Sequence, residues 1–103
     1  MIDGRVIEIL EDNIKSTLTV YQWALHCKYD CQKKFSRDFK KVFGIRPKSI
    51  LIEKRLLYIK RFLELNKEDI FYSSALELGF ENDQALYKFV KRHTGKSLTD
   101  FVS

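Results

Sequence analysis

The sequence has little of what cross-links, rigidifies or anchors a chain. Its 103 residues include one proline, four glycines and two cysteines, a composition typical of an ordinary helical protein and unlike a fibrous or disordered one. No apolar run approaches the roughly 18 residues that a membrane span requires. The start, MIDGRVIEILEDN, carries acidic residues where a signal peptide carries basic ones. We therefore expect a cytoplasmic chain that makes one domain, or two small subdomains sharing a linker, with no membrane partner.

The few residues with catalytic or metal-binding chemistry are poorly placed for either role. Cys27 and Cys31 lie close to His26, but a zinc site needs four ligands, usually in two short-spaced pairs, and no second pair is present. We expect Cys27 in the core, Cys31 on the surface, and both reduced. Neither His26 nor His93 has a nucleophile or a paired carboxylate nearby in the sequence. The sequence thus predicts no metal, no cofactor and no enzyme activity.

Positive charge is concentrated in one part of the chain. Residues 28–61 contain twelve Lys or Arg and three acidic residues, a local net charge of +9, whereas residues 1–27 and 62–87 are both net negative. Such a basic block is typical of a polyanion-binding protein, with nucleic acid the first candidate and an anionic membrane surface the second. A solvated, lysine-rich helix face is the alternative that charge alone leaves open.

An internal repeat favours nucleic acid. Shifting the sequence by 51 residues aligns Ala24 with Ala75, Lys40 with Lys91 and Gly44 with Gly95. Each copy predicts a short helix that ends near residue 27 or 78, a turn, and a second helix that opens near 31 or 82 and stops at its glycine. Two helices joined by a short turn form a helix-turn-helix unit.

The second helix of each copy has an apolar side and a polar, basic side. Phe35 and Phe39 in the first copy, and Leu86 and Val90 in the second, are expected to face the core. The side chains left outside combine cations with hydrogen-bonding groups, which suits a helix in a major groove. They are Lys33, Ser36, Arg37 and Lys40 in the first copy, and Gln84, Tyr87, Lys88 and Lys91 in the second.

A long helix is predicted between the copies. Pro47 suits its first turn, and Ile52, Leu56, Ile59 and Leu63 form an apolar stripe, with Lys54, Arg55, Lys60 and Arg61 elsewhere around it. A helix of roughly 18 residues spans about 27 Å, and adjacent major-groove faces of B-DNA lie about 34 Å apart. We expect the helix to hold two readers on adjacent turns of DNA. The opening segment, with Val6, Ile7, Leu10 and Ile14, is expected to pack on the first unit.

Three stretches, read together, resemble a known family. They are Phe35-Ser-Arg37-Asp-Phe39-Lys40-Lys41-Val-Phe-Gly44-Ile-Arg-Pro47, then Arg55-Leu56-x-x-Ile59-x-x-Phe62-Leu63, then Gly79-Phe80-x5-Leu86-x-Lys88-x-Val90-Lys91-x3-Gly95. The chain resembles, over residues 5–102, the DNA-binding domain of the bacterial AraC/XylS-type transcriptional regulators. The resemblance implies an all-α, homeodomain-like fold of about seven helices in one domain, residues 1–103. Its parts would be a first helix-turn-helix unit at 5–46, a linker helix at 47–66 and a second unit at 67–102.

The resemblance also implies a function and its residues. The family binds asymmetric double-stranded promoter DNA and regulates transcription initiation, usually as activators acting through RNA polymerase. The positions similar to its base-reading residues are Lys33, Ser36, Arg37, Asp83, Gln84, Tyr87 and Lys88. Because the basic block lies in the first unit and the linker helix, most phosphate contacts are expected there. The expected phosphate-binding residues are Lys34, Lys40, Lys41, Lys48, Lys91 and Arg92.

Several alternatives stay open at this point. Cys31 stands where the family commonly has a capping Ser, so Asp30 is the alternative cap of the first recognition helix, and Ser74 stands where an aliphatic residue is expected. Asp83 either discriminates between bases, by accepting from cytosine N4, or caps its helix from the first turn. The chain is either a complete small regulator or part of a longer one with a sensor or dimerisation domain. The rival function is a degenerate family member that docks on RNA polymerase or another regulator without reading DNA.

Overall fold

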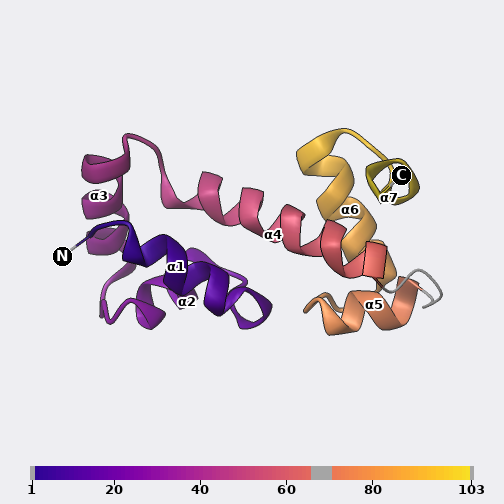
Figure 1. The fold of residues 1–103 in the computed structure, drawn as a ribbon, viewed down its shortest axis with the longest axis horizontal. Coiled ribbons are helices and arrows are strands. Elements are labelled where there is room, and N and C mark those ends of the chain that lie inside the picture. The colour runs from indigo at the N-terminus through magenta and orange to yellow at the C-terminus, as the bar shows by residue number, and fades with distance from the viewer. Residues whose placement is uncertain (1, 66–70, 103) are drawn as a thin grey trace. The chain divides into compact units, whose positions relative to one another are not determined.

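The computed structural model describes residues 2–65 and 71–102, with only the backbone of Phe71 and Tyr72. These residues form seven α-helices, one short 3-10 turn, Ile14–Ser16, and no strand (Figure 1). The helices are α1 (Arg5–Asp12), α2 (Val20–His26), α3 (Gln32–Phe43), α4 (Pro47–Leu65), α5 (Phe71–Glu77), α6 (Asp83–Thr94) and α7 (Leu98–Val102). The prediction of an all-α fold with about seven helices is confirmed.

The chain divides into two compact units, Met1–Arg55 and Leu56–Ser103. The division falls within α4, so the first half of this helix belongs to the first unit and its second half to the second. Each unit has its own apolar core. The boundaries 5–46, 47–66 and 67–102, and the spacing of two readers by α4, stay predictions.

Trp23 lies at the centre of the first unit's core. Its side chain is fully buried and its ring nitrogen, Nε1, donates a hydrogen bond of 2.8 Å to the carbonyl oxygen of Val6 in α1. Its ring packs edge-on against Phe35 and Phe39 of α3, with ring centroids 5.3 and 5.1 Å apart. One residue thus joins α1, α2 and α3, which lie together in Figure 1. The sequence analysis did not single it out.

The second unit has an aliphatic core between the end of α4 and helices α5, α6 and α7. Its fully buried side chains include Ala75, Leu78, Leu86 and Val90. The 51-residue shift pairs Trp23 with Ser74, and Ser74 is also buried. Among the described residues its hydroxyl has no hydrogen-bond partner. The two units therefore share helix order but not core chemistry, since an aromatic centre in one is replaced by a small polar residue in the other.

Helix α4 buries a different stripe from the one predicted. Its buried residues recur every fourth position, at Leu51, Arg55, Ile59 and Leu63, while Ile52 and Leu56 are half-buried. The prediction placed Arg55 outside the apolar stripe, whereas the structure buries it. The Arg55 guanidinium is buried because it donates a hydrogen bond of 2.6 Å to the carbonyl oxygen of Ile14. Hydrophobic periodicity could not predict this burial, because a buried arginine depends on a hydrogen-bond partner elsewhere in the sequence.

The turns of the two units match residue for residue. The amide of Tyr29 donates to the carbonyl of Ala24 at 2.9 Å, and the amide of Phe80 donates to the carbonyl of Ala75 at 2.9 Å. In both turns the second residue after the helix has a left-handed backbone, with φ of 66° at Lys28 and 90° at Gly79. A left-handed φ costs a residue with a Cβ atom about 1–2 kcal/mol. The second turn avoids this cost because it uses glycine.

Lys28→Gly is expected to stabilise the first unit by about 0.5–1 kcal/mol, because the relief of backbone strain exceeds the extra entropy of glycine in the unfolded chain. The measurement is the free energy of unfolding from urea denaturation. Lys28→Ala is the matched control, since it removes the same charge but keeps the Cβ atom. Equal stability of the two variants would contradict the strain.

Candidate nucleic-acid interface

Helix α3 is held by its apolar side and presents a basic side to solvent. Phe35 and Phe39 are fully buried, while Lys33 and Arg37 are exposed. Gly44, with φ of 75°, ends the helix as expected. Because two aromatic anchors sit one helical turn apart, the backbone that carries the outer cations is fixed against the core.

The start of α3 has no side-chain cap. The N-cap residue is Cys31, not Asp30, and no side chain there accepts a hydrogen bond from the first turn. The expectation that Asp30 caps the helix is therefore wrong. In α6 the equivalent residue, Asn82, accepts a hydrogen bond of 2.9 Å from the amide of Ala85. The first recognition helix thus lacks an interaction that the second one has.

Cys31→Asn is expected to stabilise the first unit by about 1 kcal/mol, the usual contribution of an N-cap side chain. The extended backbone of Cys31, with φ of −136° and ψ of 120°, already suits a cap. The measurement is the midpoint of thermal unfolding followed by circular dichroism. Cys31→Ala serves as the control, and a gain of the same size for alanine would show that capping is not the cause.

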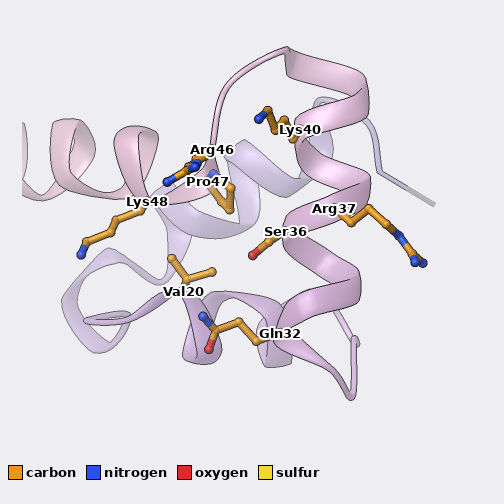
Figure 2. Close-up of a pocket in the computed structure, with 8 residues that line it drawn as sticks. All are labelled: Val20, Gln32, Ser36, Arg37, Lys40, Arg46, Pro47 and Lys48. Carbon is orange, nitrogen blue, oxygen red and sulfur yellow. The ribbon is translucent and has the colours of Figure 1, made fainter.

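The predicted base-reading residues of α3 do not share one side. A cavity of about 330 Å³ lies beside the helix, and Gln32 and Ser36 point toward it in Figure 2. Arg37 extends the other way, out from α3. Ser36 is half-buried, whereas Lys33 and Arg37 are exposed. Ser36 and Arg37 thus both line this cavity, but the Ser36 side chain points into it and the Arg37 side chain points away.

The carboxylate of Asp38 lies beside Arg37, the cation that extends out from α3. One carboxylate oxygen of Asp38 lies 3.8 Å from Nε of Arg37, and the other accepts a hydrogen bond of 3.0 Å from the hydroxyl of Tyr29. Burial, and second this hydrogen bond, raise the pKa of the Tyr29 phenol. The turn residue Tyr29 thus holds an acid beside Arg37. The sequence did not reveal this arrangement, because Tyr29 and Asp38 are nine residues apart and no local pattern joins them.

In α6 the candidate residues are arranged differently. Asn82 caps the helix, so the capping role proposed for Asp83 belongs to its neighbour. Asp83 lies in the first turn, and Tyr87 packs against the second core. Burial, followed by the charge of Asp83 and a hydrogen bond to it, raises the pKa of the Tyr87 phenol. Gln84 and Lys88 are exposed.

The predicted phosphate-binding residues all lie at the surface. All six side chains are exposed: Lys34, Lys40, Lys41, Lys48, Lys91 and Arg92. Lys91 differs from the others because its ammonium donates a hydrogen bond of 3.0 Å to the carbonyl oxygen of Gly95 at the end of α6. The ammonium has two further N–H donors, so Lys91 could keep this bond and still donate to a phosphate.

Groups suited to metal or redox chemistry are sparse in the described part of the chain. No three His, Cys, Asp or Glu side chains there come together as a metal site requires. Burial raises the pKa of the Cys27 thiol to about 11, which disfavours its reactive thiolate. Cys31 is exposed, as expected, whereas Cys27 was expected in the core and is half-buried against it. None of the described helices is long and apolar enough to cross a membrane.

The arrangement of α2 with α3, and of α5 with α6, is that of two helix-turn-helix units. A family model described as a helix-turn-helix domain, of AraC type, matches residues 32–103. The chain belongs to the AraC-type helix-turn-helix family. The resemblance seen in the sequence is thereby confirmed. No curated protein matches the sequence significantly.

The AraC-type fold also covers the residues that precede the family match. The chain is similar to the crystal structure of the DNA-binding domain of AdpA, a global transcriptional factor, in complex with a target DNA. The similarity has a TM-score of 0.71 and 23% sequence identity, and it covers 96% of this chain and 87% of the other. At this identity the likeness shows the fold, including α1 and α2.

Proposed function

We propose that the chain binds double-stranded promoter DNA sequence-specifically, with α3 and α6 as its recognition helices, and so regulates transcription initiation. The observation that carries the proposal is the duplicated unit. Two recognition helices begin 51 residues apart, each fixed by a buried apolar side and each with cations and hydrogen-bonding groups outside. A solvated surface helix has no reason to occur twice in the same setting.

In the first unit, affinity and sequence preference are assigned to different residues. Lys34, Lys40, Lys41 and Lys48 supply charge for phosphates, which attracts any sequence. Lys33 and Arg37 reach base edges, and an arginine pairs best with O6 and N7 of guanine. Ser36 is the third proposed reader, at the edge of this surface. Because α3 is fixed by Phe35 and Phe39, its side chains meet DNA without reorganisation of the helix.

In the second unit, base reading falls to Gln84, Lys88, Asp83 and Tyr87. Glu77 and Glu81 are exposed near its turn, so phosphate attraction is weaker there and Lys91 and Arg92 supply it. Tyr87 interacts with the Asp83 carboxylate, one turn earlier on α6, through its charge and a hydrogen bond. We propose that this carboxylate accepts from cytosine N4 and disfavours other bases.

The test is a salt titration of binding, followed by selection from a random duplex pool. A DNA reader should lose affinity steeply with salt, with a slope of about −0.9 per phosphate contact. Selected sequences should contain two short blocks about one helical turn apart. A single block would mean that α6 is silent, and absence of duplex binding at low salt would contradict the proposal.

An unoccupied apolar surface favours a second, protein-binding function. Tyr21 and Leu25 lie on the outside of α2, and Leu18 lies just before it, with about half of each side chain exposed. Leu76 of α5, the residue that the repeat pairs with Leu25, is exposed as well. Exposed apolar patches often mark protein contacts. We propose RNA polymerase as the partner and activation as the output, which transcription with purified polymerase would test against Leu25→Ser.

A further inference from the structure

The cavity beside α3 is shaped by two elements of the first unit. Gln32, Ser36 and Lys40 recur every fourth residue on one side of α3. Arg46 and Lys48 flank the first residue of α4, Pro47, on the facing wall (Figure 2). The lining thus combines two apolar residues, Val20 of α2 and Pro47, with cations from α3 and from the start of α4.

The cations around this cavity are not neutralised. Within the described residues, Lys40, Arg46 and Lys48 form no ion pair, and no acidic residue lines the cavity. Arg37, the fourth cation of the lining, lies 3.8 Å from Asp38 and points away from the cavity. The positive end of the dipole of the 19-residue helix α4 adds to their field. A space with three free cations and two hydrogen-bonding side chains, from Gln32 and Ser36, favours an anion with several acceptor oxygens.

The opposite flank of α3 provides an internal comparison. A second cavity there, of about 400 Å³, is lined by Lys28 and Lys34 but also by Asp30 and Asp38. Its charges cancel. The two flanks of one recognition helix therefore differ in electrostatics, and only the flank that faces the start of α4 selects for an anion.

We infer that this cavity seats a single phosphate group. The inference rests on the proposed DNA binding, in which the group is one backbone phosphate of the duplex. Arg46 and Lys48 hold it from α4, and Lys40, Ser36 and Gln32 hold it from α3. The seat fixes the depth and register of α3 in the groove, so that Arg37 on the other side meets one base pair. Arg46 and Gln32 thereby join the binding residues, and the inference moves Ser36 from the base-reading role given above to a phosphate contact.

The test combines one protein change with one DNA change. A duplex of the preferred sequence is prepared with single methylphosphonate substitutions, each of which removes one phosphate charge. Wild-type protein should lose affinity roughly tenfold at one position that lies beside the α3 contact. Arg46→Ala should bind the unmodified duplex more weakly than the wild type and keep the same base preference. The methylphosphonate at that position should lower the affinity of this variant only slightly further.

The matched control is Arg5→Ala. Arg5 is an exposed arginine of the same unit, paired with Asp3 at 3.0 Å, so its removal changes the net charge equally. This variant should respond to the methylphosphonates as the wild type does. The seat is refuted if Arg46→Ala loses as much affinity at every position as the wild type, or if it changes base preference as Arg37→Ala does.

A second arm separates the seat from the DNA proposal and tests free phosphate as the other source. Inorganic phosphate is titrated at constant ionic strength while amide shifts are followed by NMR. Saturating changes at Ser36, Lys40 and Lys48 in wild type but not in Arg46→Ala support an anion seat, even for a chain that binds no duplex. If the chain binds no duplex, the absence of these shift changes overturns the seat. If the chain binds duplex, the methylphosphonate experiment decides whether the seat exists.

Discussion

Arg37→Ala is expected to remove most of the sequence preference of the first unit and to lower affinity for the preferred site by about 1–3 kcal/mol. Binding to random duplex should change far less. Arg37 is exposed, points out from α3, and is held near Asp38, which Tyr29 positions. A cation presented in this way from a fixed helix can pair with a guanine edge at small entropic cost.

The measurement is a gel-shift titration against the selected site and against sites with single base changes. Lys41→Ala is the matched control, because Lys41 is exposed one turn further along the same helix. It should weaken all sequences alike and flatten the salt slope by about one. If Arg37→Ala leaves both affinity and preference unchanged, α3 is not placed in the groove as proposed.

Trp23→Ala is expected to cost about 3–5 kcal/mol of unfolding free energy, the usual range for a buried tryptophan. A domain of this size has only about 5–15 kcal/mol in total. The change empties the space between Phe35 and Phe39 and leaves the Val6 carbonyl without its donor. Since α3 rests on this ring, we also expect DNA binding to fall at temperatures where the wild type is folded.

Unfolding should be followed by far-ultraviolet circular dichroism in urea, because the substitution removes the chain's one tryptophan. Tyr21→Ala is the control on the same helix, since Tyr21 is about half exposed and should cost no more than about 0.5 kcal/mol. A loss below about 1 kcal/mol for Trp23→Ala would show that the first unit does not depend on this aromatic centre.

The features predicted correctly from the sequence are those with local causes. Gly44 and Gly95 end α3 and α6 because a left-handed residue suits a helix end, and both have φ near 75°. Phe35, Phe39, Leu86 and Val90 are buried because helical periodicity places them on one side. The repeat then extends each local inference to the other copy.

The features that were missed depend on contacts between distant residues. The repeat did not indicate a central Trp23, because it pairs this residue with a serine. Arg55 was placed outside the apolar stripe because its partner, the Ile14 carbonyl, is 41 residues away. The cap of α3 was misplaced because Asp30 and Cys31 are neighbours, and only the backbone decides which is the first non-helical residue.

The sequence by itself determined the helical fold, the duplicated helix-turn-helix order, the family and the basic block. The fold, the repeat and the basic block follow from periodicity, turn residues and composition, which act over a few residues or sum over many, and the family follows from the resemblance of three stretches. The tertiary structure alone decided that Trp23 centres one core, that Arg55 is buried, and that Ser36 and Arg37 point to different sides of α3. It also brought Arg46 and Lys48 beside α3. The physical reason is that burial, pairing and a shared cavity depend on which distant residues the packed helices bring within a few ångströms.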